Sequence, residues 1–256
     1  VTARHNVTSE RLTVIQRGVD LAKFSPEAVS ADRLTALRTA WGVAPDARLV
    51  VQAARQTRWK GQHVLIGAAA RLKDIAGLED VVFILAGDDQ GRNAYTQELT
   101  KRIEALGLTG RVKLTGHCSD VPAAFLAATG GVVPSIEAEA FGRASAEAQA
   151  MGCPVIVSDL GALPETLGSK QDGSCPTGWT FESGNEIALA SRIEAALRLS
   201  KDVVEEMRMT ARAHVAANFS KTVLQSKTLL VYDGLIGSRL AEAFDSAIDA
   251  VDFLPS

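Results

Sequence analysis

Residues 134–154 constrain the fold of this chain more than any other stretch. An apolar run at 131–133 ends at Pro134, a short acidic loop follows, and an alanine-rich segment at 142–151 predicts a helix that ends before Pro154. A junction of strand, loop and helix presents unpaired backbone N–H groups and the positive end of a helix dipole, and both attract phosphate. The stretch therefore predicts an anion site at the start of a helix.

The residues around this predicted helix start have the chemistry to bind an elongated phosphorylated ligand. Phe141, Gly142 and Arg143 would supply the backbone amides, and Gly142 lets a ligand approach without a Cβ in the way. Glu139 precedes the helix and Glu147 lies one turn inside it, so the two carboxylates reach different parts of one ligand. A simpler interpretation stays open, in which Glu147 pairs with Arg143 and Glu139 is a solvated loop acid.

The rest of the chain alternates apolar runs with segments of helical spacing. This alternation predicts an α/β fold, a Rossmann-like doubly wound and mostly parallel sheet of about six strands, with a C-terminal helical tail. A further short β-branched strand is expected within residues 10–26. The six expected strands are at 49–54, 81–86, 112–115, 131–133, 155–157 and 178–181, and expected helices include 31–41, 187–199 and 204–219.

Composition excludes several classes of protein. A net charge of -3 with a pI near 5.9 argues against a nucleic-acid binder. Cys118, Cys153 and Cys175 are scattered, which indicates reduced cytosolic thiols rather than a disulfide framework or a zinc site. Asp88 and Asp89 are adjacent, but turn and helix-capping roles are favoured over a metal site.

Basic residues follow the first buried strand. Arg55 comes directly after it, and Lys60 with Gly61 opens the next helix. Cations at the carboxyl end of a parallel strand lie at the usual ligand crevice of an open α/β sheet. Arginine offers a planar fork and lysine a point charge to a phosphate, although surface charge is the simpler alternative. The turn after this strand lacks Gly-x-Gly-x-x-Gly, which argues against an NAD-binding domain.

Several motifs occur in the order that one enzyme family shows. Together they resemble the C-terminal, donor-binding domain of a GT-B fold retaining glycosyltransferase of family 4 (group 1), over roughly residues 10–235. Gln16-Arg17 stands where that family usually has Pro-Asn, and Ala54 replaces a glycine. The matching pieces are Gly18-Val19-Asp20, Arg55 with Lys60-Gly61, Glu139 to Glu147, 151–155 and Pro164-Glu165.

The resemblance implies a role for each matching residue. Glu139 would lie beside the donor sugar and diphosphate, Glu147 would bind the ribose hydroxyls, and Arg55 with Lys60 would clamp the diphosphate. As catalytic residues we therefore expect Glu139, Arg55 and Lys60. The remaining donor contacts it implies are Gly18 at the phosphate, Gly116 and Ile136 near the base and ribose, and the amides of Phe141, Gly142 and Arg143.

The resemblance also implies a function. A hexose-type sugar would pass from a UDP-, GDP- or ADP-sugar to a glycan or lipid-linked acceptor. The reaction would need no obligatory cofactor or metal, and it would belong to the synthesis of cell-envelope polysaccharide. Residues 1–22 would be an interdomain linker and first strand, 23–219 the donor-binding domain, and 220–256 a helical tail that packs on an N-terminal acceptor domain absent here.

Without that domain we expect an inactive fragment. A cytoplasmic location is expected, with peripheral membrane association left open. Three alternatives remain: a sugar-nucleotide epimerase or a phosphorylase of the same fold, and a non-catalytic nucleotide-binding module.

Overall fold

The structure, a computed structural model, describes residues 8–91, 93–168 and 176–252, so Cys175 lies outside the described residues. Within these ranges one sheet has the strand order β3-β2-β1-β4-β5-β6, and every neighbouring pair is parallel. The predicted doubly wound sheet is therefore confirmed. Its strands are β1 (Arg48–Ala53), β2 (Val81–Ala86), β3 (Val112–Gly116), β4 (Gly130–Val133), β5 (Val155–Ser158) and β6 (Gly178–Phe181).

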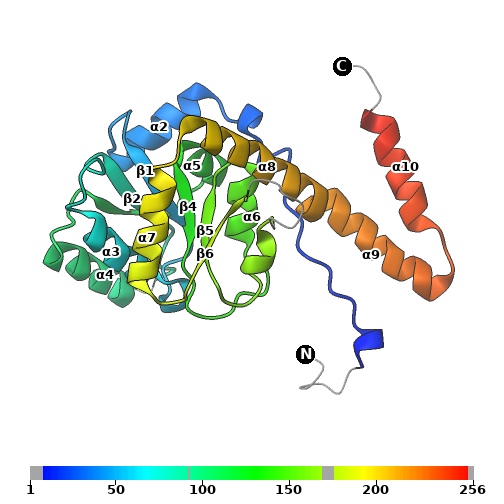
Figure 1. The fold of residues 1–256 in the computed structure, drawn as a ribbon. Helices are drawn as coiled ribbons and strands as arrows, with labels where there is room; N and C mark the ends of the chain where they lie inside the picture. The colour runs from blue at the N-terminus through cyan, green and yellow to red at the C-terminus, as the bar shows by residue number, and fades with distance from the viewer. Residues whose placement is uncertain (1–7, 92, 169–175, 253–256) are drawn as a thin grey trace.

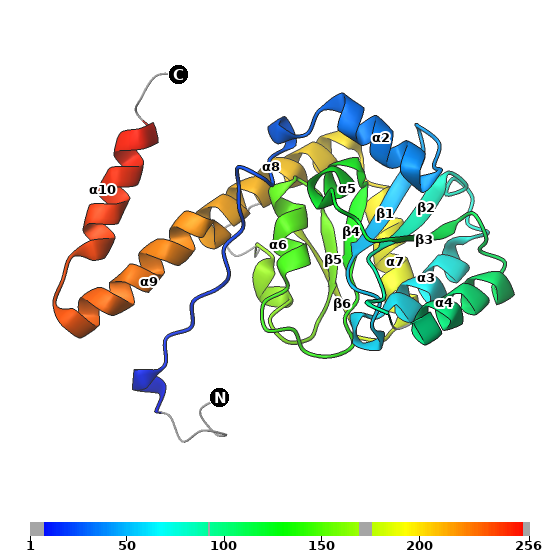
Figure 2. The ribbon, with the colours of Figure 1, turned by 180° about the vertical axis from the view of Figure 1, so that it is seen from behind.

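Helices cover both faces of the sheet (Figures 1 and 2). The helices of one face pack on each other and on the sheet through one hydrophobic core, and those of the other face do so through a second core. On the first face lie α2 (Ala31–Trp41), α5 (Val121–Ala127), α6 (Arg143–Ala150) and α8 (Lys201–Phe219); on the second lie α3 (Gln62–Leu72), α4 (Asn93–Ala105) and α7 (Glu186–Leu197).

The apolar strands explain this three-layer arrangement. Side chains alternate between the faces of a strand, so Leu49 and Val51 of β1 enter the first core while Val50 enters the second. All three are buried. A strand that is buried on both faces needs a continuous apolar run, which is why these runs predicted parallel strands.

The prediction of a short strand within residues 10–26 is wrong. The structure has a 3-10 turn at Ser9–Arg11 and then extended chain without a strand, and only Val19 makes an isolated bridge, to Ser220. A β-branched sequence needs a neighbouring strand edge to form a ladder, and this segment runs outside the six-stranded sheet (Figure 1). Val19 ties this segment to the junction between α8 and α9 through hydrogen bonds with Phe219 and Lys221.

The tail beyond Ser220 is helical, as expected. Helix α9 (Lys221–Ile236) projects from the body, and α10 (Leu240–Asp252) turns back and packs against it (Figures 1 and 2). Asp233 fixes the turn because its carboxylate accepts hydrogen bonds from the amides of Leu240 and Ala241, at 2.7 and 2.9 Å. Across the described ranges, no helix combines the length and apolarity that crossing a membrane requires.

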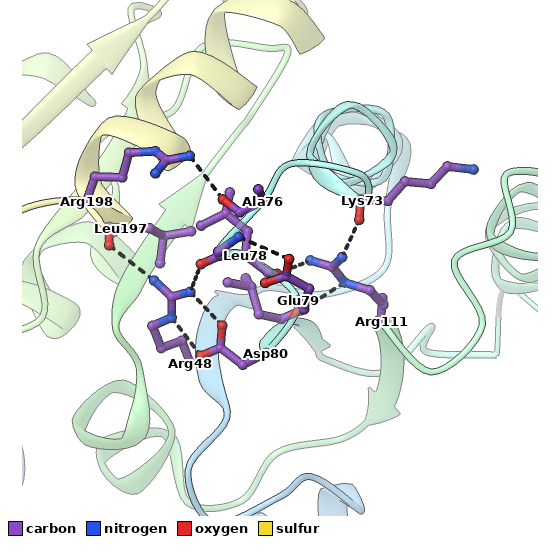
Figure 3. A network of polar contacts seen from close by, with 11 residues as sticks. Arg48, Lys73, Ala76, Leu78, Glu79, Asp80, Arg111, Leu197 and Arg198 are labelled. Atoms are coloured by element: carbon purple, nitrogen blue, oxygen red, sulfur yellow. Dashed lines mark hydrogen bonds and ion pairs between the residues drawn. The ribbon is translucent and has the colours of Figure 1, made fainter.

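The amino end of the sheet is closed by arginine side chains (Figure 3). Arg48, the first residue of β1, donates through Nε to Asp80 Oδ2 at 2.7 Å, and Arg111 donates to the carbonyls of Lys73 and Leu78 at 2.8 and 2.6 Å. The two bonds from Arg111 satisfy carbonyls of the segment that joins α3 to β2. The opposite, carboxyl end of the sheet is left to the candidate site.

Candidate functional site

The site lies where the strand order reverses. The chain moves outward from β1 through β2 to β3 and then returns to β4 on the other side of β1. At such a switch point the loops after two neighbouring strands diverge to opposite faces and leave a crevice. Here the loop after β1 carries Arg55 and Lys60, and the loop after β4 carries Glu139.

An open cleft of about 380 Å³ occupies this crevice. Seven of the ten predicted site residues line it, so the structure brings together groups that lie far apart in the sequence. The side chains that line it are mostly charged or small: Arg17, Ala53, Ala54, Arg55, Lys60, Glu139, Ala140, Phe141, Gly142, Arg143, Ala144 and Glu147.

Buried glutamines hold the loop that carries the two cations. Gln52 donates to the carbonyl of Lys60 at 2.7 Å, and Gln62 donates to the carbonyl of Arg55 at 2.8 Å. Tyr95 donates in turn to Gln62 at 3.3 Å, and burial raises the pKa of Tyr95 to about 12, so its hydroxyl stays protonated. These amide contacts fix the backbone of the loop before any ligand binds.

Lys60 and Glu139 form an ion pair at the bottom of the cleft. Lys60 Nζ lies 2.7 Å from Glu139 Oε1, and the two side chains are 15% and 10% exposed. Ser135 Oγ donates to the same carboxylate oxygen. The turn at Gly61 brings the two loops together, because a Cβ there would lie 1.8 Å from the carbonyl oxygen of Pro134.

The backbone of Glu139 is held by a third loop, after β5. Glu139 bridges Gly161, and its carbonyl accepts the amide of Ala162 at 3.1 Å. A Cβ on Gly161 would lie 2.8 Å from both the nitrogen and the oxygen of Glu139. Gly161 therefore permits the close approach that positions this carboxylate.

The start of α6 forms another wall of the cleft. Gly142 has φ 94 and caps the helix without a side chain, and the amides of Gly142, Arg143 and Ala144 donate to no described residue. In place of Gly142, a residue with a Cβ would adopt a strained left-handed backbone angle, and its Cβ would meet Leu163 Cδ2 at 2.5 Å and displace the end of that buried side chain. Free amides at a helix start attract an anion.

Glu147 and Arg143 pair across one turn of α6. Arg143 Nη2 lies 2.8 Å from Glu147 Oε1, while Glu147 is 14% exposed and Arg143 is 71% exposed. The simpler interpretation of this glutamate, a pair with Arg143, is therefore observed. The pair also lines the cleft, so a ligand that reaches Glu147 competes with an exposed guanidinium.

Three predicted residues do not line the cleft. Gly18 packs on the junction of α8 and α9, where a Cβ would lie 2.7 Å from Lys221 Cα. Ile136 packs against the second core, and its amide donates to the carbonyl of Trp59 at 2.8 Å. Gly116 ends β3, which β2 and β1 separate from β4. Contacts of these three with a ligand remain predictions.

Arg17 lines the cleft and was not predicted to. Sequence reasoning noted it only as a departure from a motif, and its signal was a cation next to Gly18.

The expected turn role of Asp89 is confirmed, because its carboxylate accepts a hydrogen bond from the amide of Gly91 at 2.9 Å. Within the described ranges, no group of three or more His, Cys, Asp or Glu side chains is placed to hold a metal ion.

The cleft thus offers four cations, two carboxylates and free amides to one ligand. Cations and amides bind phosphate oxygens, and carboxylates accept hydrogen bonds from hydroxyl groups. A phosphorylated ligand that also carries hydroxyl groups, such as a sugar or a ribose, fits this set of donors and acceptors.

Comparison with known proteins agrees with this chemistry. A family model described as "Glycosyl transferases group 1" matches residues 35–214. The D-inositol 3-phosphate glycosyltransferase of Mycobacterium tuberculosis (strain ATCC 25177 / H37Ra) is 32% identical over 246 residues, which cover 94% of this chain and 48% of that protein. The chain spans about half the length of the curated relatives it matches.

Solved structures share the fold. A glycosyltransferase from Rickettsia africae ESF-5 aligns with a TM-score of 0.84 and 28% identity, over 91% of this chain and 60% of that chain. The Anabaena protein HepE, solved in complex with UDP-glucose, aligns with a TM-score of 0.77 and 28% identity, over 90% of this chain and 60% of that chain.

Proposed function

This chain belongs to the group 1 glycosyltransferases, and we propose that it is the donor-binding half of a retaining, family 4 enzyme that transfers a hexose from a nucleotide-diphosphate sugar. The observation that carries the proposal is the cleft at the switch point, where Arg55, Lys60 and the start of α6 converge. We propose a UDP-sugar as donor, because the related HepE was solved with UDP-glucose.

The cleft is suited to a leaving diphosphate. Negative charge grows on the diphosphate as the bond to the sugar breaks, and preorganised cations and amides stabilise that charge without rearranging. Arg55 is exposed at the rim, where its Nη1 lies 3.4 Å from Gln90 Oε1, and Lys60 is held deeper by Glu139. A diphosphate that lies between them would also face the amides of Arg143 and Ala144.

The two glutamates would bind the hydroxyl groups of the donor. Glu139 lies next to Lys60, so a sugar joined to the diphosphate would fall within its reach. Glu147 lies one turn inside α6, and we assign the phosphates to the start of that helix, so a ribose joined to them would lie toward Glu147. The guanidinium of Arg143, which is 71% exposed, would move away from Glu147 to admit the ribose when the donor binds.

We place the acceptor site in another part of the protein. The chain spans about half of its curated relatives, and α9 exposes apolar side chains that a further domain would cover. The glycan or lipid-linked acceptor, the envelope pathway and the cytoplasmic location remain predictions from the sequence. The exposed apolar side chains of α9 are Leu230, Tyr232, Leu235 and Ile236, which are 58%, 53%, 75% and 68% exposed.

Calorimetric titration of this chain with UDP, GDP, ADP and NAD tests the proposal. We expect one nucleoside diphosphate to bind and Glu147→Ala to weaken it. Glu194→Ala is the matched control, because Glu194 also pairs with an arginine one turn away, Arg198, but lies on α7 outside the cleft. Preferential binding of NAD, or equal binding by both variants, would contradict the proposal.

A further inference from the structure

Arg17 lies on a segment whose backbone is fixed by the junction of α8 and α9. Val19 donates its amide to the carbonyl of Phe219 at 2.7 Å and accepts the amide of Lys221 at 3.0 Å. Gly18 lies so close to this junction that a Cβ would meet Lys221 Cα at 2.7 Å. The position of Arg17 at the cleft is therefore set by the fold and not by a free chain end.

The guanidinium of Arg17 is exposed and makes no ion pair or hydrogen bond with any described residue. It borders the cleft and also a second cavity of about 240 Å³, which the cleft meets at Ala140 and Phe141. Glu165 lines that second cavity without pairing with Arg17. Arg143, which lines the same cleft, differs in having a carboxylate partner, Glu147, at 2.8 Å.

The charges of the cleft do not balance without a ligand. It contains four basic and two acidic side chains, an excess of two positive charges. Lys60 pairs with Glu139 and Arg143 pairs with Glu147, so the excess belongs to Arg17 and Arg55. A diphosphate that joins a nucleoside to a sugar carries two negative charges, which matches this excess.

We propose that Arg17 binds the diphosphate of the donor, as a third cation beside Arg55 and Lys60. The inference rests on the proposed function, since it assigns a further residue to the same site. Arginine suits the role because its planar fork donates two parallel hydrogen bonds to phosphate oxygens. Arg17 approaches the cleft from the N-terminal segment, so a bound diphosphate would contact both that segment and the loop after β1.

The test compares Arg17→Gln with Arg11→Gln in calorimetric titrations with UDP and in nuclear magnetic resonance titrations with uridine. Arg11 is a matched control, because it lies on the same segment but lines a groove beside α9. We expect Arg17→Gln to weaken UDP binding roughly tenfold, the usual effect of losing one charged hydrogen-bond donor. Uridine binding should not change, and Arg17→Lys should recover part of the UDP affinity.

Each other outcome overturns the inference. If the wild-type chain binds UDP and Arg17→Gln binds it equally well, Arg17 is not a diphosphate ligand, while the proposed function stands. Equal weakening of UDP and uridine would show a structural effect in place of phosphate recognition. A wild-type chain that binds no UDP overturns the inference and the proposed function together.

Discussion

At the residue scale, the ion pair of Lys60 and Glu139 links the stability of the cleft to its chemistry. Both side chains are largely buried and lie 2.7 Å apart. A charge in such a place depends on its partner, because it has lost most of its contact with water. The same two groups are those that we assign to the diphosphate and the sugar.

Lys60→Ala should therefore reduce the free energy of unfolding by about 2–3 kcal/mol, because it leaves the Glu139 side chain without its cation. The matched variant is Arg143→Ala, which removes the exposed partner of Glu147 and should cost less than about 1 kcal/mol. Urea unfolding of both variants at pH 7 measures the difference. Equal small losses would show that the Lys60 pair is as weak as a surface pair.

The sequence predicted the charged residues of the site better than the residues that hold them in place. Arg55, Lys60, Glu139 and Glu147 follow recognisable spacings, and all four line the cleft. The supporting contacts join loops that lie far apart in the sequence, such as Gly161 against Glu139. No local pattern marks a glycine or a glutamine that acts through a distant loop, so these contacts could not be predicted.

At the element scale, the start of α6 depends on Gly142. Gly142→Ala should lower the free energy of unfolding by about 2–4 kcal/mol, from roughly 1–2 kcal/mol of left-handed backbone strain and a further cost of crowding Leu163. Gly110→Ala is the control, because Gly110 has φ 87 with no atom within 4 Å of an added Cβ. Thermal and urea unfolding should show only the strain for Gly110→Ala. Equal losses for the two variants would contradict the role of Leu163.

The arginine cluster at the opposite end of the sheet makes a prediction about pH (Figure 3). The hydrogen bond from Arg48 holds the pKa of Asp80 below its ordinary value of 3.8. Because this pKa is lowered on folding, the ionised carboxylate stabilises the fold above about pH 4, and that contribution is lost as the pH falls through the lowered pKa. The gain is under about 1 kcal/mol, since the pair is partly exposed.

Unfolding in urea between pH 3 and pH 7 measures this effect. The difference in stability between wild type and Asp80→Asn should be largest at pH 6–7 and shrink toward pH 3. In an Arg48→Gln background the same substitution should have little effect at any pH. A difference that grows as the pH falls would have the wrong sign for this account.

The elements themselves were predicted well where they are buried. The run at 81–86 coincides with β2, because a strand covered on both faces leaves a continuous apolar signal. The run at 178–181 coincides with β6, although that edge strand is only partly buried. The segment around Val14 and Ile15 carries a similar signal but lies outside the sheet. Its apolar side chains instead line a groove beside α9, a role that local sequence does not distinguish from a strand.

At the scale of the whole molecule, we expect this chain to bind the donor and to transfer no sugar. The cleft is open, and catalysis by acyl or glycosyl transfer needs the reacting groups to be held together. Incubation with UDP-glucose and a panel of sugar acceptors, followed by chromatography, should show no transfer product. Steady turnover by residues 1–256 alone would place the acceptor site within them. That result would refute the proposal that the acceptor site lies in another part of the protein.

A crystal structure of this chain with UDP is the most direct test of the central claim, that the cleft at the switch point is a donor site. We expect the diphosphate to contact Arg55, Lys60 and the first amides of α6. The ribose hydroxyls should bind Glu147, and the guanidinium of Arg143 should have moved away from Glu147. UDP bound at another surface, or an empty cleft in crystals grown with saturating UDP, would contradict the account.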